Sequence, residues 1–236
     1  MTQGNPWVRS ASASKVRERP EMTGEDWREW LPSSPTSTGE PRAAVEAEAA
    51  ADVDEPTGPV APQPHVPLPE DALPVRRTHS SAALWVVGAH GGAGESSLAE
   101  LDPSWQAAGR AWPELPTGAP VACVVVARTN VRGLLAARTA LTQWAASGAG
   151  ESVRLLGLVL VADAPGKTPA PIRDLAKVVG GGAPRVWHVP WVEAWRLGDP
   201  VTERVPRPVS KLVSTLRSLA ATAVADADPS HSEETS

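Results

Sequence analysis

The chain has 236 residues, a formal net charge of −5, 25 prolines, ten tryptophans and one cysteine. This length has room for one ordinary domain with extensions or for two small domains. A single thiol excludes an intrachain disulfide, no Cys and His cluster has zinc spacing, and no apolar run reaches the length of a membrane span. The first residues also lack the apolar stretch of a secretory signal. We therefore expect a cytoplasmic protein without a membrane span.

Three segments differ in composition. Residues 1–80 combine many prolines with Ser, Thr, Glu and Ala and have almost no apolar periodicity, so they cannot bury enough surface to offset the entropy of ordering. We interpret them as a disordered tail, residues 81–224 as one α/β domain, and residues 225–236 as an acidic disordered tail. Charge that keeps the tails solvated explains their acidity better than a tail folded back on a basic face.

Tryptophans in the N-terminal tail are candidate anchors for a partner protein. Trp7 stands in an otherwise polar segment, and Trp27 and Trp30 fall on one face of a single helical turn. A tryptophan-rich composition that scatters these residues by chance explains them equally well. The tail therefore leaves open an adaptor function that works through short motifs.

Within the domain, apolar runs alternate with helical patterns. Buried strands are expected at about 83–88, 121–127, 155–162 and 185–189. Helices are expected from residue 95 to before residue 102, and at about 131–147, 170–178, 191–197 and 208–223. Continuous apolar strands that alternate with helices imply a parallel sheet covered on both faces, which is a three-layer α/β fold. Cys123 lies inside the second strand and is expected to pack in the core.

The first of these strands leads into a glycine-rich loop and a helix start, with the sequence His90-Gly91-Gly92-Ala93-Gly94-Glu95-Ser96-Ser97. Phosphate-binding loops need glycines that turn N–H groups inward, a lysine for the outer phosphates and a hydroxyl for Mg²⁺. The segment resembles the P-loop of the ParA/MinD family of ATPases, which reads K-G-G-x-G-K-[ST]-[ST]. The resemblance implies a P-loop NTPase fold over roughly residues 82–222, supported by a later strand, proline, short helix and glycine turn at 186–201.

Both lysines of the resembled loop are replaced, the first by His90 and the second by Glu95. Two like charges about 4 Å apart cost on the order of 4 kcal/mol at an effective dielectric of 20, where a lysine would attract by a similar amount. The resemblance thus implies a vestigial nucleotide-binding loop made of Gly91, Gly92, Ala93, Gly94, Glu95, Ser96 and Ser97. We expect the Glu95 carboxylate to satisfy the loop N–H donors itself.

The acids that hold metal and water in the resembled family have no evident counterpart here. Only about 20 residues separate the loop helix from the next strand, and that strand ends in Ala-Arg-Thr-Asn without an aspartate. Asp163, after the third strand, could serve as a metal ligand and Lys167 as a phosphate ligand. A turn residue and a surface lysine are the favoured interpretations.

Cations near the carboxyl ends of the strands are candidates for holding an anion. Arg128 and Arg132 lie where open α/β sheets bind ligands, although a solvated helix face is the favoured interpretation. His188, inside a strand pattern, is expected to be a core or edge histidine rather than a ligand. Apart from the Asp163 alternative, the sequence leaves open whether a metal is bound.

The sequence therefore predicts a non-hydrolysing binding or regulatory module without catalytic residues. The ParA/MinD resemblance implies a role in plasmid or mobile-element maintenance, or in positioning the chromosome or septum. An ATP-binding switch with unusual site residues and the tail-based adaptor are the alternatives. We expect no cofactor, with ATP and Mg²⁺ as the alternative. A protein is the expected partner, with DNA and a second copy of the chain, forming a homodimer, as alternatives.

Overall fold

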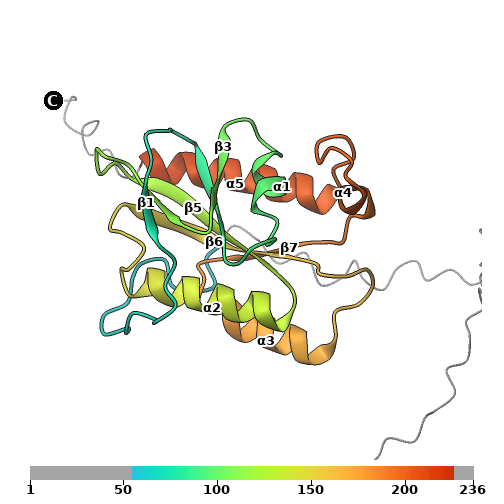
Figure 1. Ribbon diagram of the computed structural model, residues 1–236, viewed down its shortest axis with the longest axis horizontal. Coiled ribbons are helices and arrows are strands. Elements are labelled where there is room, and N and C mark those ends of the chain that lie inside the picture. Colours follow the sequence, from blue (N-terminus) through green and yellow to red (C-terminus); the bar gives the residue numbers. More distant parts are fainter. Residues whose placement is uncertain (1–54, 226–236) are drawn as a thin grey trace, which may run out of the picture. The chain divides into compact units, whose positions relative to one another are not determined.

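The computed structural model describes residues 55–225, which are built around a five-stranded parallel sheet (Figure 1). The strands lie in the order β3-β2-β5-β6-β7. Their bounds are Trp105–Gly109 for β3, Leu84–Gly88 for β2, Val121–Arg128 for β5, Val153–Val161 for β6 and Val186–Val189 for β7. A separate parallel pair joins β1 (Val75–Arg77) to β4 (Trp112–Glu114). The prediction of an α/β fold with a parallel sheet is confirmed.

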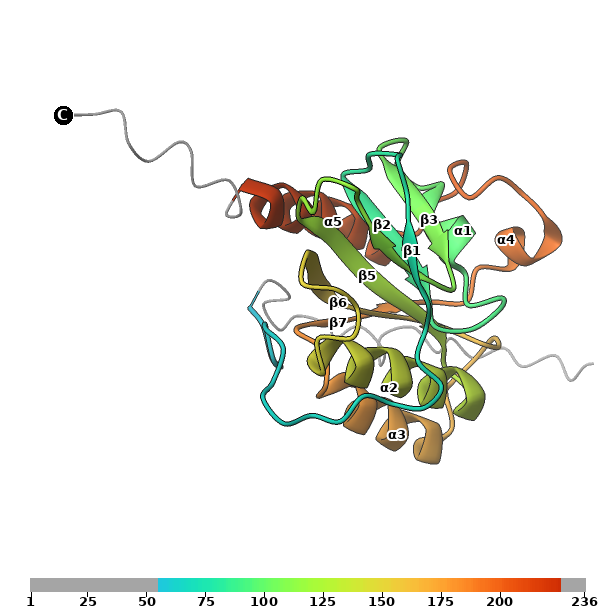
Figure 2. The ribbon, with the colours of Figure 1, turned by 60° about the vertical axis from the view of Figure 1, so that its left-hand side comes forward.

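Helices cover both faces of the sheet (Figures 1 and 2). Helices α2 and α3 pack on one face, and α1 and α5 pack on the other. The bounds are Glu95–Ala99 for α1, Val131–Ala145 for α2, Ala170–Gly180 for α3, Glu193–Leu197 for α4 and Arg207–Ala225 for α5. The sheet is therefore the middle layer of three.

Two hydrophobic cores result, because successive side chains of a strand point to opposite faces. Val87 and Val125 belong to the core under α2 and α3, whereas Val86 and Val124 belong to the core under α1 and α5. Cys123 is fully buried in the first of these cores, and its burial raises the pKa of its thiol. Its predicted role in core packing is confirmed.

All four apolar runs form strands of the central sheet, but the sequence did not predict β3. The segment WQAAG has one large apolar residue and no alternating pattern, so it looks like a connection. It nevertheless pairs with β2, and Trp105 enters the core under α1 and α5. The interval from residue 102 to residue 119 thus contains β3 and β4.

Residues 55–80, which the sequence assigned to the tail, pack on the domain. The Leu73 side chain is buried, and its backbone N–H donates to Gln143 Oε1 at 2.7 Å. Gln143 Nε2 donates in return to the Leu73 carbonyl at 2.7 Å. Nearer the start, the Thr57 N–H donates to the Pro184 carbonyl at 2.9 Å. The packed part of the chain therefore begins before residue 81.

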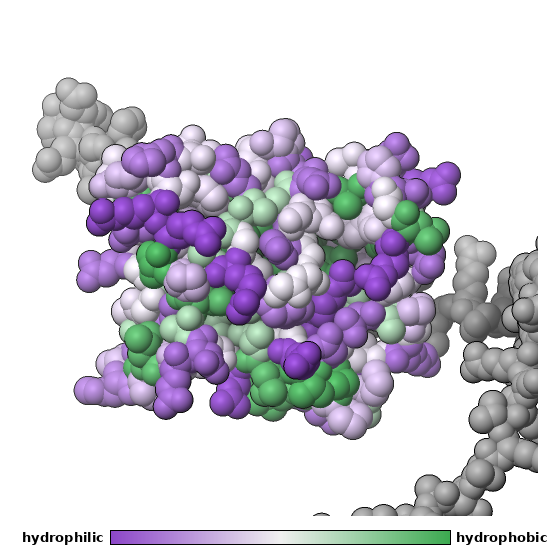
Figure 3. Space-filling model, in the orientation of Figure 1, coloured by the Kyte–Doolittle hydropathy of each residue, from purple (hydrophilic) through white to green (hydrophobic). Residues whose placement is uncertain are grey.

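The described surface mixes polar and apolar areas. Figure 3 shows an apolar patch where α2 and α3 lie side by side, and the exposed apolar side chains of these helices include Val131, Leu135 and Val178. Among residues 55–225 no helix is both long and apolar enough to span a membrane.

Candidate functional site

The turn between β2 and α1 has backbone conformations that favour glycine. The φ angle is +74° at Gly92 and +104° at Gly94, in the left-handed region that side chains with a Cβ rarely adopt. Gly94 is also the N-cap of α1, a helix of five residues. The predicted succession of strand, glycine turn and helix is confirmed, while its kinship with phosphate-binding loops stays a prediction.

Most backbone donors of this turn are unused within the described part of the chain. Of the N–H groups from Gly91 to Ser97, only that of Ala93 donates, to the His90 carbonyl at 3.3 Å. Successive N–H groups in a turn with alternating φ sign point toward a common concavity. The turn thus keeps open donors of the kind that anions bind.

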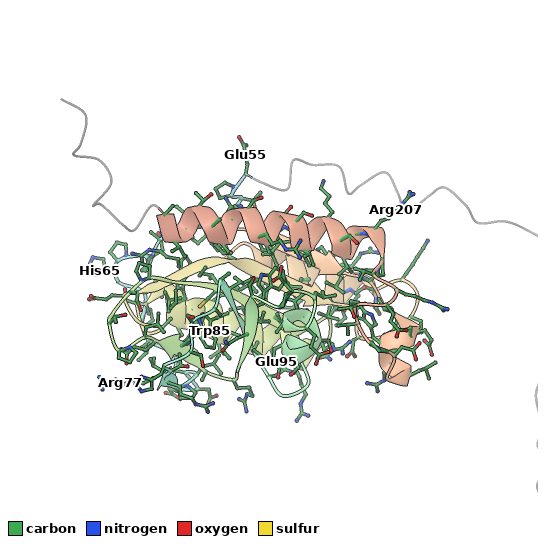
Figure 4. All side chains as sticks on the ribbon, turned by 90° about the horizontal axis from the view of Figure 1, so that it is seen from above. Glu55, His65, Arg77, Trp85, Glu95 and Arg207 are labelled. Carbon is green, nitrogen blue, oxygen red and sulfur yellow. The ribbon has the colours of Figure 1, made fainter. Side chains whose placement is uncertain are left out.

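Glu95 does not fill those donors. Glu95 is the first residue of α1 (Figure 4). This half-buried residue has its carboxyl beside the end of β2, where a Cβ built on Gly88 would come within 3.1 Å of Glu95 Cδ. Within residues 55–225 no hydrogen bond joins this carboxyl to the turn. The expectation that Glu95 satisfies the donors itself is therefore wrong, because its side chain turns back toward the strand. Its negative charge remains at the turn without a bonded partner from the described residues.

His90 fastens the turn to the end of β5. The Arg128 N–H donates to His90 Nε2 at 3.1 Å, and His90 Nδ1 lies 3.0 Å from the Gly91 carbonyl. Both contacts are satisfied by a neutral imidazole that carries its proton on Nδ1. A Cβ on Gly133 would lie 2.9 Å from His90 Nε2 and 2.3 Å from the Arg128 carbonyl oxygen, so only glycine lets the start of α2 approach this closely.

The Arg128 guanidinium bridges the turn and the end of β6. Its Nε donates to the Gly92 carbonyl at 3.3 Å and its Nη1 donates to the Ala162 carbonyl at 2.9 Å. The side chain is half-buried. These bonds place one positive charge beside the turn, although two of the donors are spent on main-chain carbonyls. Arg132, by contrast, is exposed on the first turn of α2 and fits the solvated-face interpretation.

The structure brings the end of β6 close to the glycine turn. A Cβ on Gly94 would meet the Val161 side chain at 3.7 Å. Asp163 follows two residues later, and its N–H donates to Thr129 Oγ1 at 3.2 Å. The Asp163 side chain is exposed, and Lys167 is exposed farther along the same loop. Asp163 therefore lies on the same edge of the sheet as the turn, as the alternative interpretation requires.

The other predicted site residues divide into two groups. Ser96 is exposed and Ser97 half-buried in the first turn of α1. Trp7, Trp27 and Trp30 lie outside the described residues. No group of three or more His, Cys, Asp or Glu side chains between residues 55 and 225 is arranged to hold a metal ion.

One buried acid has a structural role that the sequence did not indicate. Asp102, at the end of the α1 segment, accepts from the Ser104 N–H at 2.8 Å and from its hydroxyl at 2.6 Å, and it pairs with Arg217 of α5. Burial by itself would raise the pKa of Asp102, but the bonds from Ser104 and Arg217 hold it below its ordinary value. The pair ties α5 to the turn before β3.

A groove between α3 and β7 contains functional candidates that sequence reasoning missed or set aside. Arg173 and Lys177 of α3 and His188 of β7 line it, together with Thr129 and Thr168. The basic side chains stand four residues apart on one helix, which is a visible signal. Their meeting with His188 depends on the pairing of β6 with β7, and no sequence motif marks it.

Comparison with known proteins adds a family but no activity. A family model described as a family of unknown function (DUF6668) matches residues 82–227, which is more than half of the chain. The chain belongs to this family. The matched region begins just before β2, so the segment with Leu73 and β1 lies outside it. A search of curated proteins found no match.

Proposed function

We propose that this member of the DUF6668 family is a non-hydrolysing binding or regulatory module built on a degenerate ParA/MinD-like P-loop fold. The observation that carries the proposal is the position of Glu95. Its carboxylate lies at the glycine turn, beside Gly88, and Glu95 stands at the sequence position of the phosphate-binding lysine in the resembled loop. Phosphoryl transfer depends on positioning and on neutralising phosphate charge, and a carboxylate opposes both.

The contacts around the turn support a structural role for it. His90 and Arg128 fasten the turn to the ends of β5 and β6 through hydrogen bonds of 2.9–3.3 Å. The Arg128 donors that reach Gly92 and Ala162 are bound to main-chain oxygens rather than free for a ligand. The end of β5 carries Arg128, Thr129 and Asn130, and none of these side chains supplies a carboxylate for Mg²⁺.

A protein is the partner that we favour. The apolar side chains of Val131 and Leu135, exposed on α2, are typical of surfaces that bind other proteins. The tryptophan motifs of the N-terminal tail, which lie outside the described residues, belong to the adaptor alternative. Deletion of residues 1–54 distinguishes these ideas, because a partner held by the domain is retained and a partner held by the tail is lost.

A second candidate, an ATP-binding switch, is favoured by one observation. The N–H groups of Gly92, Gly94 and Ser96 have no acceptor within the described residues, and Asp163 lies on the same edge of the sheet. In that case the open donors would hold phosphate while Asp163 served the metal. Such a site would bind ATP although the turn carries the negative charge of Glu95.

Calorimetric titration of the full chain with ATP, ADP and GTP in the presence of Mg²⁺, together with an ATPase assay, tests the two candidates. The module predicts no saturable nucleotide binding and no turnover above background. Tight ATP binding by the wild type contradicts it and supports the switch. Turnover that disappears in Asp163→Ala or Lys167→Ala would assign those side chains to the metal and the phosphate.

A further inference from the structure

We propose that the groove between α3 and β7 is a binding site for a small organic anion, with a phosphate or carboxylate head held by Arg173 and Lys177 and an apolar body against Ala176 and Val186. The site is separate from the glycine turn and goes beyond the proposed function. Three features of the groove support a ligand of this kind. They are its volume, its positive charge and the difference between its two ends.

The groove has the dimensions of a small-molecule site. Its volume is about 470 Å³, and its lining comes from α3, from β7, from the loop residues Thr129 and Thr168, and from Thr57 of the segment that precedes β1. Ligand sites in proteins commonly enclose about 300–1,000 Å³ and combine apolar walls with a few polar groups. The lining follows that composition, with Ala176 and Val186 beside the basic side chains.

The charge of the groove is positive and unbalanced within the described part of the chain. Arg173 and Lys177 are four residues apart on α3 and so lie on the same face of the helix. Neither forms an ion pair with any residue between 55 and 225. Among residues 55–225 no acid lines the groove, and the side chains of Asp163 and Asp174 are exposed outside it. Two like charges at this spacing repel, and a bound anion would remove the repulsion.

The two ends of the groove differ, which gives the ligand a direction. At one end α3 closes on β7, where a Cβ on Gly180 would lie 2.8 Å from Val186 Cγ2. Toward the other end lie Thr129 and Thr168, at the edge formed by the carboxyl ends of the strands. The apolar body therefore points toward Gly180 and the charged head toward Arg173.

His188 completes the polar side of the site. It projects from the edge strand β7 opposite the α3 cations. It keeps part of its surface open to solvent, but the groove removes enough water to lower the pKa of the imidazole. The imidazole places a hydrogen-bonding ring nitrogen on the β7 side of the groove, opposite the two cations of α3.

Three probes test the proposal on the full-length chain. The binding of each probe is measured by NMR titration of the ¹⁵N-labelled protein, in which amide shifts report the site. Phenyl phosphate has both head and body, inorganic phosphate has only the head, and phenol has only the body. We expect phenyl phosphate to saturate at millimolar concentration or below, with amide shifts at Thr129, Thr168 and Gly181. Each single-feature probe should bind about tenfold or more weakly, because it lacks either the charged contacts or the apolar ones.

Matched variants assign the binding to the groove. The double variant Arg173→Gln/Lys177→Gln should weaken phenyl phosphate about tenfold or more. The control Arg138→Gln/Lys211→Gln removes the same charge from exposed positions of α2 and α5 and should leave the affinity unchanged. Failure of phenyl phosphate to saturate, shifts confined to other surfaces, or equal weakening by both double variants would overturn the proposal. The affinity of Glu95→Lys for phenyl phosphate should equal that of the wild type, because Glu95 does not line the groove. The test of the groove is therefore independent of the test of the proposed function, and either proposal can be overturned while the other stands.

Discussion

The glycine turn after β2 and the groove between α3 and β7 carry opposite arrangements of charge and packing. The turn has a sequence pattern typical of phosphate binding, yet it presents the Glu95 carboxylate, and its Arg128 is bonded to the Gly92 and Ala162 carbonyls. The groove has no such pattern, yet it presents Arg173 and Lys177 without described acid partners. The motif therefore marks a backbone shape at the turn. The cations that make no ion pair within residues 55–225 mark the groove where we propose that an anion binds.

The comparison also separates cations that stabilise the fold from cations available to a ligand. Hydrogen bonds to main-chain oxygens commit Arg128 to the structure, while the α3 cations are exposed and make no described ion pair. Substitutions should then cost stability at the turn and not at the groove.

The largest difference in unfolding free energy between the turn and the groove should come from substitutions that change packing. Gly133→Ala places a Cβ 2.3 Å from the Arg128 carbonyl oxygen, and we expect a loss of about 3 kcal/mol in the free energy of unfolding. Gly181→Ala is the matched change at the groove, where the nearest atom is at an ordinary 3.5 Å. It should be neutral or stabilising by up to about 1 kcal/mol. Urea denaturation measures both, and equal losses would show that the two regions are packed alike.

The next largest difference in stability should come from the substitution of Arg128 at the turn and of Arg173 at the groove. Arg128→Gln removes both charge-assisted bonds to the turn and to β6, and we expect a loss of about 2 kcal/mol. Arg173→Gln removes an exposed cation and should change stability by no more than about 0.5 kcal/mol. Thermal melts of the two variants decide the matter. A larger loss in Arg173→Gln would mean that the groove cation supports the fold.

Asp102 is an acid that is bonded to Ser104 and Arg217, whereas Glu95 has no bonded partner among the described residues. Asp102→Ala should cost about 1 kcal/mol, since Ser104 and Arg217 can regain water when their acceptor is lost. Glu95→Ala should cost less. The pKa of folded Asp102 lies below its ordinary 3.8, so its contribution is complete above that pH and is lost as the pH falls through the lower folded value. Melts of wild type and Asp102→Asn should therefore converge in acid, and a constant difference would argue against the pair.

The smallest effect should come from His188 in the groove. Its folded pKa lies below the ordinary 6.5, so the unfolded chain takes up a proton at a higher pH than the folded chain does. The contribution of the neutral imidazole to the free energy of unfolding should be fully present above about pH 6.5 and should decrease as the pH drops below that value. His188→Gln should reduce that fall, measured as the difference in Tm between about pH 7.5 and pH 5.5. An unchanged pH dependence would place the imidazole in full solvent.

The sequence predicted the elements that are buried on both faces. Residues 121–127 of β5 and residues 155–161 of β6 are continuous apolar runs, and α2 and α5 have helical periodicity. It did not predict β3, because Trp105–Gly109 joins the sheet through backbone pairing with β2 and not through an apolar pattern.

The candidate site was predicted in the same partial way. Glycines with positive φ can be recognised locally, and the turn after β2 was therefore found. The direction of the Glu95 side chain depends on the space above Gly88, which a linear pattern does not contain. The groove needs α3 and β7 to meet, so its cations were visible in the sequence but their common cavity was not.

Glu95 replaces the phosphate-binding lysine of the resembled loop, and its substitution tests directly whether this carboxylate prevents nucleotide binding. Calorimetric titration with ATP and Mg²⁺ should compare the wild type, Glu95→Lys and Glu100→Lys, where the last variant makes the same charge change at an exposed position just after α1. We expect saturable binding in Glu95→Lys alone, because the turn with its open N–H groups then carries a cation instead of a carboxylate. Tight ATP binding by the wild type, or no binding by a folded Glu95→Lys, would contradict the account.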